Sequence, residues 1–316
     1  MKALRICVLG GTGFIGSHLV HRLDRLGHSV TVLTRRPERH REFRIGSSVR
    51  LLAVNPYDDN ALQTLFSDTD CVINLVGILN QAGKSRFQPA HVDLPRNIVK
   101  AMRETGVSRL LHMSALNADV NETHSLYLKS RGQGEDLVHQ APGLNVTSFR
   151  PSVVFGPGDS FFNRFAGLLN MAPVLPLACP GARFAPVFVG DVVEAFVRAL
   201  GDNSTIGRRL ELCGPKTYTL KQLVEYTAQV IERKALIIGL PDFASRIQGR
   251  LLGLVPGKPF TIDNYYSLKK DSVCSESALT GLGITAHSVE AVVPAYLGKR
   301  STRAQYYRYR TLARRS

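Results

Sequence analysis

Short apolar runs alternate with stretches of helical periodicity through the first 150 residues of the chain. Runs of this length, bounded by turn residues, are typical of buried strands. They predict strands at Leu4–Leu9, Val30–Thr34, Arg50–Val54, Cys71–Leu75, Arg109–Met113 and Asn145–Arg150. The stretches between them predict helices at Phe14–Leu26, Asn60–Phe66, Pro89–Glu104 and Leu126–His139. Strict alternation of strand and helix predicts parallel strands joined by right-handed crossovers, and therefore an α/β fold with a doubly wound sheet.

The pattern loosens after Arg150, where prolines become frequent. Pro186–Leu200 predicts one more strand, turn and helix, with Asp191 as the helix N-cap, and we expect it to return to the main domain. Further along, the sequence predicts a helix at Leu220–Ile231, a strand at Ala235–Gly239 and amphipathic segments after Pro241 and Ser288. We therefore expect a main domain at 1–151 completed by 185–213, a small C-terminal cap domain at 152–184 and 214–297, and a basic tail at 298–316.

The composition is that of a globular protein. The chain has 316 residues, of which 44% are hydrophobic, so it can bury a substantial core. No apolar run approaches the roughly 20 residues that span a bilayer, and Leu4–Gly10 lacks the features of a signal peptide. Five cysteines without C-x-x-C spacing predict buried thiols in a reducing compartment. We therefore expect a cytoplasmic protein, with peripheral attachment to the inner face of the cytoplasmic membrane as an alternative.

The stretch "VLGGTGFIGSHL" contains four glycines, of which Gly10, Gly13 and Gly16 have the spacing G-x-x-G-x-x-G and Gly11, Gly13 and Gly16 the spacing G-x-G-x-x-G. They follow an expected strand and open an expected helix, which is the context that this motif requires. Glycine lets the backbone turn sharply and approach a pyrophosphate, while the helix N-terminus supplies amide donors. A tight turn without a ligand is the alternative. The context favours phosphate binding and predicts a Rossmann-like main domain.

The second expected strand is followed by two arginines. Arg35 lies 19 residues beyond Gly16, where an NAD-binding fold places an acidic side chain on the ribose hydroxyls. Arg35 and Arg36, beside Thr34, instead suit a 2′-phosphate, because guanidinium groups pair with phosphate through parallel hydrogen bonds. The sequence therefore predicts NADP(H) in preference to NAD(H). The alternative is that one of the two arginines faces solvent, and we expect this of Arg36 before Arg35.

The net charge of +15 is spread unevenly. "KRSTRAQYYRYRTLARRS", Lys299–Ser316, carries seven basic residues, three tyrosines and no acid. Such a segment could contact an anionic membrane surface, bind nucleic acid through phosphates and stacking, or remain a solvated terminus. A dinucleotide-type domain favours the membrane, and nucleic acid is not expected as a partner.

Several stretches resemble one family. "GGTGFIG", "NLVG" (Asn74–Gly77), "RPSVVFGPGD" (Arg150–Asp159) and "PVFVGDV" (Pro186–Val192) resemble an atypical extended short-chain dehydrogenase/reductase. Within that superfamily, the chain resembles the NAD(P)H-binding alpha-subcomplex subunit 9 family of respiratory complex I and its bacterial relatives, from about residue 4 to residue 295. The resemblance implies structural or regulatory use of the cofactor. It also implies a link to the respiratory chain or quinone metabolism, with proteins of those pathways contacting the tail and cap.

Catalytic members of the superfamily use Y-x-x-x-K with an upstream Ser or Thr, and the lysine lowers the pKa of the tyrosine. The matching stretch, "SLYLKSRGQGE", has Tyr127 at the tyrosine position and Arg131 at the lysine position. Arginine keeps the charge but presents a planar fork and does not readily give up a proton. Ser114 stands alone at the strand end, and we expect it to face the nicotinamide or cap a turn. The resemblance thus implies an altered catalytic site.

The same resemblance and the glycine motif together predict a set of cofactor contacts. They are Gly10, Thr12, Gly13, Phe14, Ile15, Gly16, Thr34, Arg35, Arg36, Asn55, Leu75, Val76, Gly77, Met113, Tyr127, Arg150, Pro151 and Val153. Asn55 stands where relatives often place an Asp on the adenine. Two other functions stay open. One is an active NADPH-dependent oxidoreductase or epimerase-like enzyme on an apolar or quinone-like substrate, and the other is a scaffold protein with a degenerate nucleotide site.

The cap contains an amphipathic segment after Pro241. Phe243, Ile247, Leu251 and Leu254 share one helical stripe, with Arg246 and Arg250 expected on the opposite side. Packing of this stripe inside the cap is the favoured interpretation. The alternative is a surface for an apolar substrate, a bilayer or a partner. The histidines at 91, 112, 124, 139 and 287 show no metal-ligand spacing, so no metal is expected.

Overall fold

A computed structural model describes residues 2–40, 43, 48–81 and 86–298. Its contacts divide the chain into two compact units, the first formed by residues 1–150 and 193–210 and the second by 151–192 and 211–316. The basic stretch that begins at Lys299, with the membrane contact predicted for it, lies outside the described residues.

A seven-stranded sheet with the order β11-β6-β5-β4-β1-β2-β3 organises the first unit. The strands are β1 (Arg5–Leu9), β2 (Ser29–Thr34), β3 (Val49–Ala53), β4 (Cys71–Asn74), β5 (Arg109–Met113), β6 (Asn145–Pro151) and β11 (Arg209–Leu212). All strand pairs from β3 to β6 are parallel. Because β1 lies between β2 and β4, the strand order reverses at its carboxyl end, where such sheets bind ligands. The predicted doubly wound α/β fold is confirmed.

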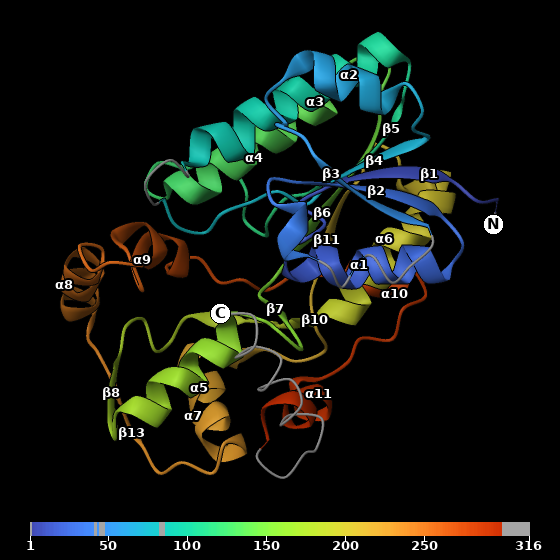
Figure 1. The fold of residues 1–316 in the computed structure, drawn as a ribbon. Coiled ribbons are helices and arrows are strands. Elements are labelled where there is room, and N and C mark those ends of the chain that lie inside the picture. The colour runs from blue at the N-terminus through green and yellow to red at the C-terminus, as the bar shows by residue number, and fades with distance from the viewer. Residues whose placement is uncertain (1, 41–42, 44–47, 82–85, 299–316) are drawn as a thin grey trace. The chain divides into compact units, whose positions relative to one another are not determined.

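Helices cover both faces of this sheet. They are α1 (Phe14–Arg25), α2 (Asp59–Phe66), α3 (Leu94–Thr105), α4 (Leu126–His139) and α6 (Val189–Gly201). Figure 1 shows α2, α3 and α4 on one face and α1 and α6 on the other. Beneath the first group, side chains such as Leu9, Phe66, Val72 and Ile98 form a buried core. Burial of these apolar side chains fixes the strand ends at which the glycine loop and its neighbours lie.

The helix expected at Pro89–Glu104 begins differently from the prediction. Residues Pro89–Asp93 form a π-helical turn (η3), and α3 starts only at Leu94. Pro95 explains the break, because it has no N–H to donate to the carbonyl of His91 four residues earlier. The turn buries His91 next to α4 and so places an imidazole ring near the predicted catalytic position.

The second unit contains short strands and helices around its own core. Its strands are β7 (Val154–Phe155), β8 (Val174–Leu177), β9 (Arg183–Phe184), β10 (Val187–Phe188), β12 (Tyr218–Thr219) and β13 (Leu236–Gly239). Its helices are α5 (Phe161–Met171), α7 (Leu220–Val230), α8 (Asp242–Leu252), α9 (Ile262–Leu268), α10 (Ala278–Gly281) and α11 (Val289–Leu297). Phe155, Phe162, Leu223 and Val293 lie in the core. No helix in the described part of the chain is long and apolar enough to cross a membrane.

Two local predictions around residue 190 are wrong. The strand expected after Pro186 is the two-residue β10, which pairs with β7 rather than joining the large sheet. Asp191 is not an N-cap, because α6 already begins at Val189. Its buried carboxylate instead accepts the His287 backbone N–H at 2.8 Å and contacts the His287 ring at 2.7 Å. Asp191 therefore fixes the segment that leads into α11.

The favoured interpretation of the amphipathic segment after Pro241, that its apolar stripe packs inside the cap, is also wrong. The buried residues of α8 are the small ones, Ser245 and Gly249. Gly249 lies against the start of α9, where an added Cβ would come 3.1 Å from the Thr261 carbonyl oxygen. Phe243 and Leu251, which were expected inside the cap, are exposed. A helix that approaches its neighbour through small residues leaves its large apolar side chains on the outside.

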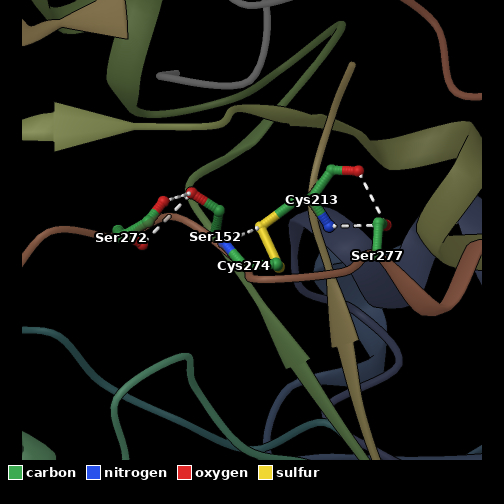
Figure 2. The surroundings of a disulfide bond; sticks show 5 residues. All are labelled: Ser152, Cys213, Ser272, Cys274 and Ser277. Atoms are coloured by element: carbon green, nitrogen blue, oxygen red, sulfur yellow. Dashed lines mark hydrogen bonds between the residues drawn. A yellow bond between two sulfur atoms is a disulfide. The ribbon is translucent and has the colours of Figure 1, made fainter. Parts of the chain in front are cut away.

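The prediction of buried free thiols holds for some cysteines and is wrong for two. Cys7 and Cys71 are buried free thiols, whereas Cys213 and Cys274 form a disulfide within the second unit. Figure 2 shows the bond between the segment after β11 and the segment after α9. Ser277 accepts the Cys213 N–H at 3.1 Å and donates to the Cys213 carbonyl at 2.9 Å, which holds the same two segments together. A disulfide is not what a reducing compartment predicts.

Candidate nucleotide-binding site

The glycine loop joins β1 to α1 in a turn that needs its glycines. Gly10 has φ of +79°, a conformation that side chains disfavour. Gly13 donates its N–H to the Gly10 carbonyl at 3.0 Å, and an added Cβ at Gly16 would lie 2.3 Å from that same oxygen. Among the described residues, no side chain caps the start of α1 at Gly13. The first amides of α1 are thus left for a ligand, and Thr12, Phe14 and Ile15 lie in the same turn.

The two predicted arginines follow the end of β2, which pairs with β1, the strand that leads into the glycine loop. Thr34 is the last residue of β2 and is buried, while Arg35 and Arg36 follow it and are exposed. The Arg36 N–H donates to Thr34 Oγ1 at 3.4 Å. Asn55 follows β3, the next strand of the sheet, and its side-chain oxygen accepts the Tyr57 N–H. These positions form the adenosine side of the sheet edge in folds of this type.

The end of β4 lies on the other side of β1. An added Cβ at Gly10 would come 3.0 Å from the backbone of Leu75 and Val76, so the glycine loop and this segment are in close contact. Asn74, the last residue of β4, accepts the Val76 N–H at 3.1 Å and contacts His112 Nδ1 at 3.2 Å. Asn74 therefore sets the path of the chain beyond β4. Sequence reasoning missed it, although its position at a strand end was a usable signal.

Arg131 occupies the position of the superfamily lysine and is buried. Its Nη1 donates to the Val76 carbonyl at 3.3 Å and to the Met113 carbonyl at 3.1 Å, at the ends of β4 and β5. Its Nε has no hydrogen-bond partner among the described residues. Gly77 makes room for the guanidinium, because an added Cβ there would lie 1.8 Å from Nη2. Arg131 thus acts as a brace between two strand ends.

Gly77→Ala is expected to lower the free energy of unfolding by about 2 kcal/mol, because the new methyl group collides with a guanidinium held by two carbonyls. Adding Arg131→Lys to Gly77→Ala should restore most of that loss, because lysine has no second terminal nitrogen to collide. Urea unfolding of the single and double variants measures the coupling. Gly167→Ala, whose new methyl has no atom of the described residues within 4 Å, is the control. If the losses of unfolding free energy in the two single variants simply add up in the double variant, the proposed contact between Gly77 and Arg131 is wrong.

Tyr127 lies one turn from Arg131 in α4, and its ring is 5.6 Å from the Arg131 guanidinium carbon. The His91 ring meets it edge to face at 5.8 Å. His91 Nε2 accepts the Ile78 N–H, so its proton resides on Nδ1 and is donated to Ser130 Oγ at 2.8 Å. Burial, followed by the nearby Arg131 charge, lowers the pKa of His91 to about 2. This histidine is therefore neutral, and sequence reasoning missed it and Ser130.

The remaining predicted residues lie at the ends of β5 and β6. Ser114 follows β5 and is buried, and its Oγ has no partner among the described residues. Arg150 is paired with the buried Glu135, donating from Nε at 3.0 Å to each carboxylate oxygen. Pro151 ends β6, and Val153 packs against the core of the second unit. Within the described residues, no group of three potential ligands could hold a metal ion.

The parallel sheet, its switch point at β1 and the glycine loop define a Rossmann-type nucleotide-binding protein. The model of the NAD dependent epimerase/dehydratase family matches residues 6–213, and the chain belongs to that family. Mouse NADH dehydrogenase (ubiquinone) 1 alpha subcomplex subunit 9, mitochondrial, is 31% identical over 264 residues, which cover 80% of this chain and 68% of the mouse protein. The resemblance predicted from the sequence motifs is confirmed.

A further curated relative and a solved structure are also similar to the chain. The ceramide reductase of Caulobacter vibrioides is 29% identical over 239 residues, which cover 75% of this chain and 74% of the reductase. The solved structure of MoeE5 in complex with UDP-glucuronic acid and NAD has a TM-score of 0.74 at 19% identity, covering 97% of this chain and 99% of MoeE5. The chain is thus an extended short-chain dehydrogenase/reductase of the NAD(P)-binding kind, related to a complex I subunit.

Proposed function

We propose that this protein binds NADP(H) and uses it as a structural or regulatory cofactor, in a setting linked to the respiratory chain or quinone metabolism. The observation that carries the choice of cofactor is the pair of exposed arginines at the end of β2. Arg35 and Arg36 offer two guanidinium groups to a 2′-phosphate at the place where NAD-binding folds use a carboxylate. The respiratory link rests on the relationship to the complex I subunit.

The residues at the strand ends fit the parts of the dinucleotide in order. The loop Gly10–Gly16 would hold the pyrophosphate on the α1 amides, and Asn55 would contact the adenine. Leu75–Gly77 and Met113 would line the nicotinamide end. Ser114 supports this assignment, because its buried hydroxyl oxygen lacks a partner among the described residues and a ligand group would supply one. The nucleotide domain proposed at 1–151 and 185–213 contains all of these positions.

Slow or absent turnover follows from Arg131. When bound, NADPH can supply a hydride to an acceptor. The acceptor also needs a proton, for which Tyr127 is the candidate donor. In the superfamily, the lysine four residues on assists that tyrosine, but here the guanidinium is held by the carbonyls of Val76 and Met113. A fixed arginine orients the strand ends and does not relay a proton. The proposal is therefore retention of the cofactor rather than its consumption.

NADPH is expected to raise the melting temperature of the purified protein more than NADH does. At 100 times its dissociation constant, a ligand adds about 2.7 kcal/mol to the free energy of unfolding. Arg35→Ala should raise the dissociation constant of NADPH by about 10- to 100-fold, since a hydrogen bond to a charged group is worth about 1.5–3 kcal/mol. It should leave that of NADH unchanged. Thermal shift and fluorescence titration measure both.

Arg39→Ala, an exposed arginine in the turn Pro37–Arg39, is the charge-matched control and should bind NADPH like the parent protein. Equal effects of Arg35→Ala on both nucleotides would contradict the 2′-phosphate contact. In the same preparation, bound NADPH should remain unoxidised when quinones or ketones are added. A complete lack of any nucleotide-induced shift would favour the scaffold function instead.

An active reductase on an apolar carbonyl or quinone-like substrate is the second candidate. Tyr127 supports it, because this side chain stands at the proton-donor position and lies beside the Arg131 cation. The similarity to a ceramide reductase supports the same class of substrate. Oxidation of NADPH by such substrates, abolished in Tyr127→Phe, would establish this activity and overturn the proposal of a retained cofactor.

A further inference from the structure

Helix α8 in the second unit presents its large apolar side chains outward. Phe243 is 68% exposed, Ile247 50%, Leu251 61% and Leu254 84%. Phe243, Ile247 and Leu251 recur at intervals of four, so they form one stripe along the helix, and Leu254 follows in the turn just beyond its end. We call this stripe, with Arg246 and Arg250, the α8 face. A contiguous apolar patch of this kind on a protein surface marks a site of interaction.

The opposite side of α8 is firmly anchored to the second unit. Ser245 is buried and accepts the Cys179 N–H at 3.1 Å, and Gln248 donates to the Pro176 carbonyl at 3.1 Å. Gly249 lies against the start of α9. Because these contacts use the small and polar residues, the helix keeps its orientation without burying the stripe. The α8 face is thus a preformed surface rather than a frayed segment.

Two arginines of α8 border the stripe. Arg246 and Arg250 lie three or four residues from stripe members, so they border the stripe rather than oppose it, contrary to the sequence prediction. Neither forms an ion pair within the described part of the chain. Asp242, in the first turn of α8, is paired with Lys269 at 2.7 Å and accepts the Tyr265 hydroxyl at 2.8 Å. The α8 face therefore combines apolar side chains with two arginines, of which Arg246 interacts electrostatically with the already paired Asp242.

A neighbouring ribbon adds to the apolar surface. Strands β8 and β13 pair in parallel, with Val174 opposite Leu236, and both of these side chains are exposed, as is Ile238. The hydrogen bond from Gln248 to Pro176 attaches α8 directly to this ribbon. The exposed apolar area of the second unit therefore extends beyond a single helix.

We propose that the α8 face docks on an anionic lipid bilayer, with Phe243 and Leu251 entering the headgroup boundary and Arg246 and Arg250 contacting lipid phosphates. An apolar stripe bordered by arginines on one exposed helix suits a bilayer, which needs no matching surface. The net charge of +15 attracts the chain to anionic lipid. A second copy fits less well, because stacking two α8 faces would bring their arginines together. The proposal does not depend on the nucleotide site.

Co-sedimentation of the full chain with vesicles tests the proposal. Vesicles of phosphatidylcholine with phosphatidylglycerol should bind the protein, and pure phosphatidylcholine should bind it at least about tenfold more weakly, given about 1 kcal/mol for each basic residue near the headgroups. F243S/L251S and R246E/R250E should each lower binding to the anionic vesicles by about tenfold or more. R25E/R103E, which changes two exposed arginines of the first unit, is the control with the same net charge and should bind like the parent protein.

Melting curves, with and without NADPH, check separately that the variants are folded. The second measurement compares the NADPH-induced shift in melting temperature with that of the parent protein. Since both substitutions lie on exposed positions, the melting temperature should stay close to that of the parent protein. Parent-like binding by F243S/L251S would overturn the proposal. So would equal losses in R246E/R250E and R25E/R103E, binding lost only when the chain is shortened to residue 298, or self-association of the parent chain that the α8 substitutions abolish.

Discussion

The free energy of unfolding is expected to fall steeply as the pH drops below 6.5, because three histidines of the first unit are held neutral. Burial is the main cause in each case. It lowers the pKa of His91 to about 2, that of His112 to about 3 and that of His139 to about 4, and nearby arginines add to the effect. In the unfolded chain, each would titrate near 6.5.

The sign follows from proton uptake. Between pH 6.5 and about 4, the unfolded chain binds these three protons and the folded chain does not, so acid favours unfolding. Each histidine contributes a slope of up to about 1.4 kcal/mol per pH unit, and three together give about 4 kcal/mol per unit. A domain with a stability of about 5–15 kcal/mol would therefore unfold within about one to four pH units below the histidine midpoint. Above pH 7 this contribution should be constant.

Urea unfolding between pH 4.5 and 7.5 measures this slope. His112→Asn should reduce it by about one proton, whatever its effect on stability at pH 7.5. His124→Asn, at an exposed position, is the matched control and should leave the slope nearly unchanged. A histidine ring titration near pH 6.5 at position 91 or 112, seen by NMR in the folded protein, would be incompatible with this account.

Reduction of the disulfide is expected to lower the free energy of unfolding by about 4 kcal/mol. Cys213 and Cys274 are 61 residues apart, and closing a loop of that size restricts the unfolded chain by about this amount in the chain-entropy model. The Ser277 hydrogen bonds to Cys213 remain after reduction, so the second unit should weaken rather than rearrange. The loss should be independent of the nucleotide.

Urea unfolding with and without dithiothreitol measures the effect, and C213S/C274S should behave like the reduced parent. Cys179→Ser changes a thiol that takes no part in the disulfide and serves as the control. Burial raises the pKa of the thiols of Cys7 and Cys71 to about 12, so these groups remain protonated and do not react under the same conditions. An unfolding midpoint that does not respond to reductant would rule the bond out as a stabilising element.

The sequence predicted the first unit well because its information is local. The strands from β1 to β6 are apolar runs, and the glycine loop needs only its spacing and its neighbours. The short β11 was missed because Arg209 and Glu211 interrupt its apolar pattern. Pro95, which interrupts the helix expected at Pro89–Glu104, was visible in the sequence. Its effect on the helix depends on the carbonyl that it leaves without a backbone N–H, which is that of His91.

What the sequence left out depends on contacts between distant segments. The roles of Asn74, His91 and Ser130 arise only once β4, η3 and α4 lie together. The Gly77 contact explains how an arginine fits at position 131, and nothing in either residue alone predicts it. For α8, the periodicity correctly predicted an apolar stripe. It could not predict which side faces the protein, because Ser245 and Gly249 provide a second, smaller packing surface.

The disulfide also changes what a break in the polypeptide would do. Residues 213 and 274 close a covalent ring that contains α7, β13, α8 and α9. The exposed connection between α8 and α9, at Leu254 to Gly257, is open to a protease. A single cut there would open the ring but leave both fragments joined through sulfur. Separation of the C-terminal fragment, which carries α9, α10 and α11, therefore takes two events, a cut and a reduction, rather than one.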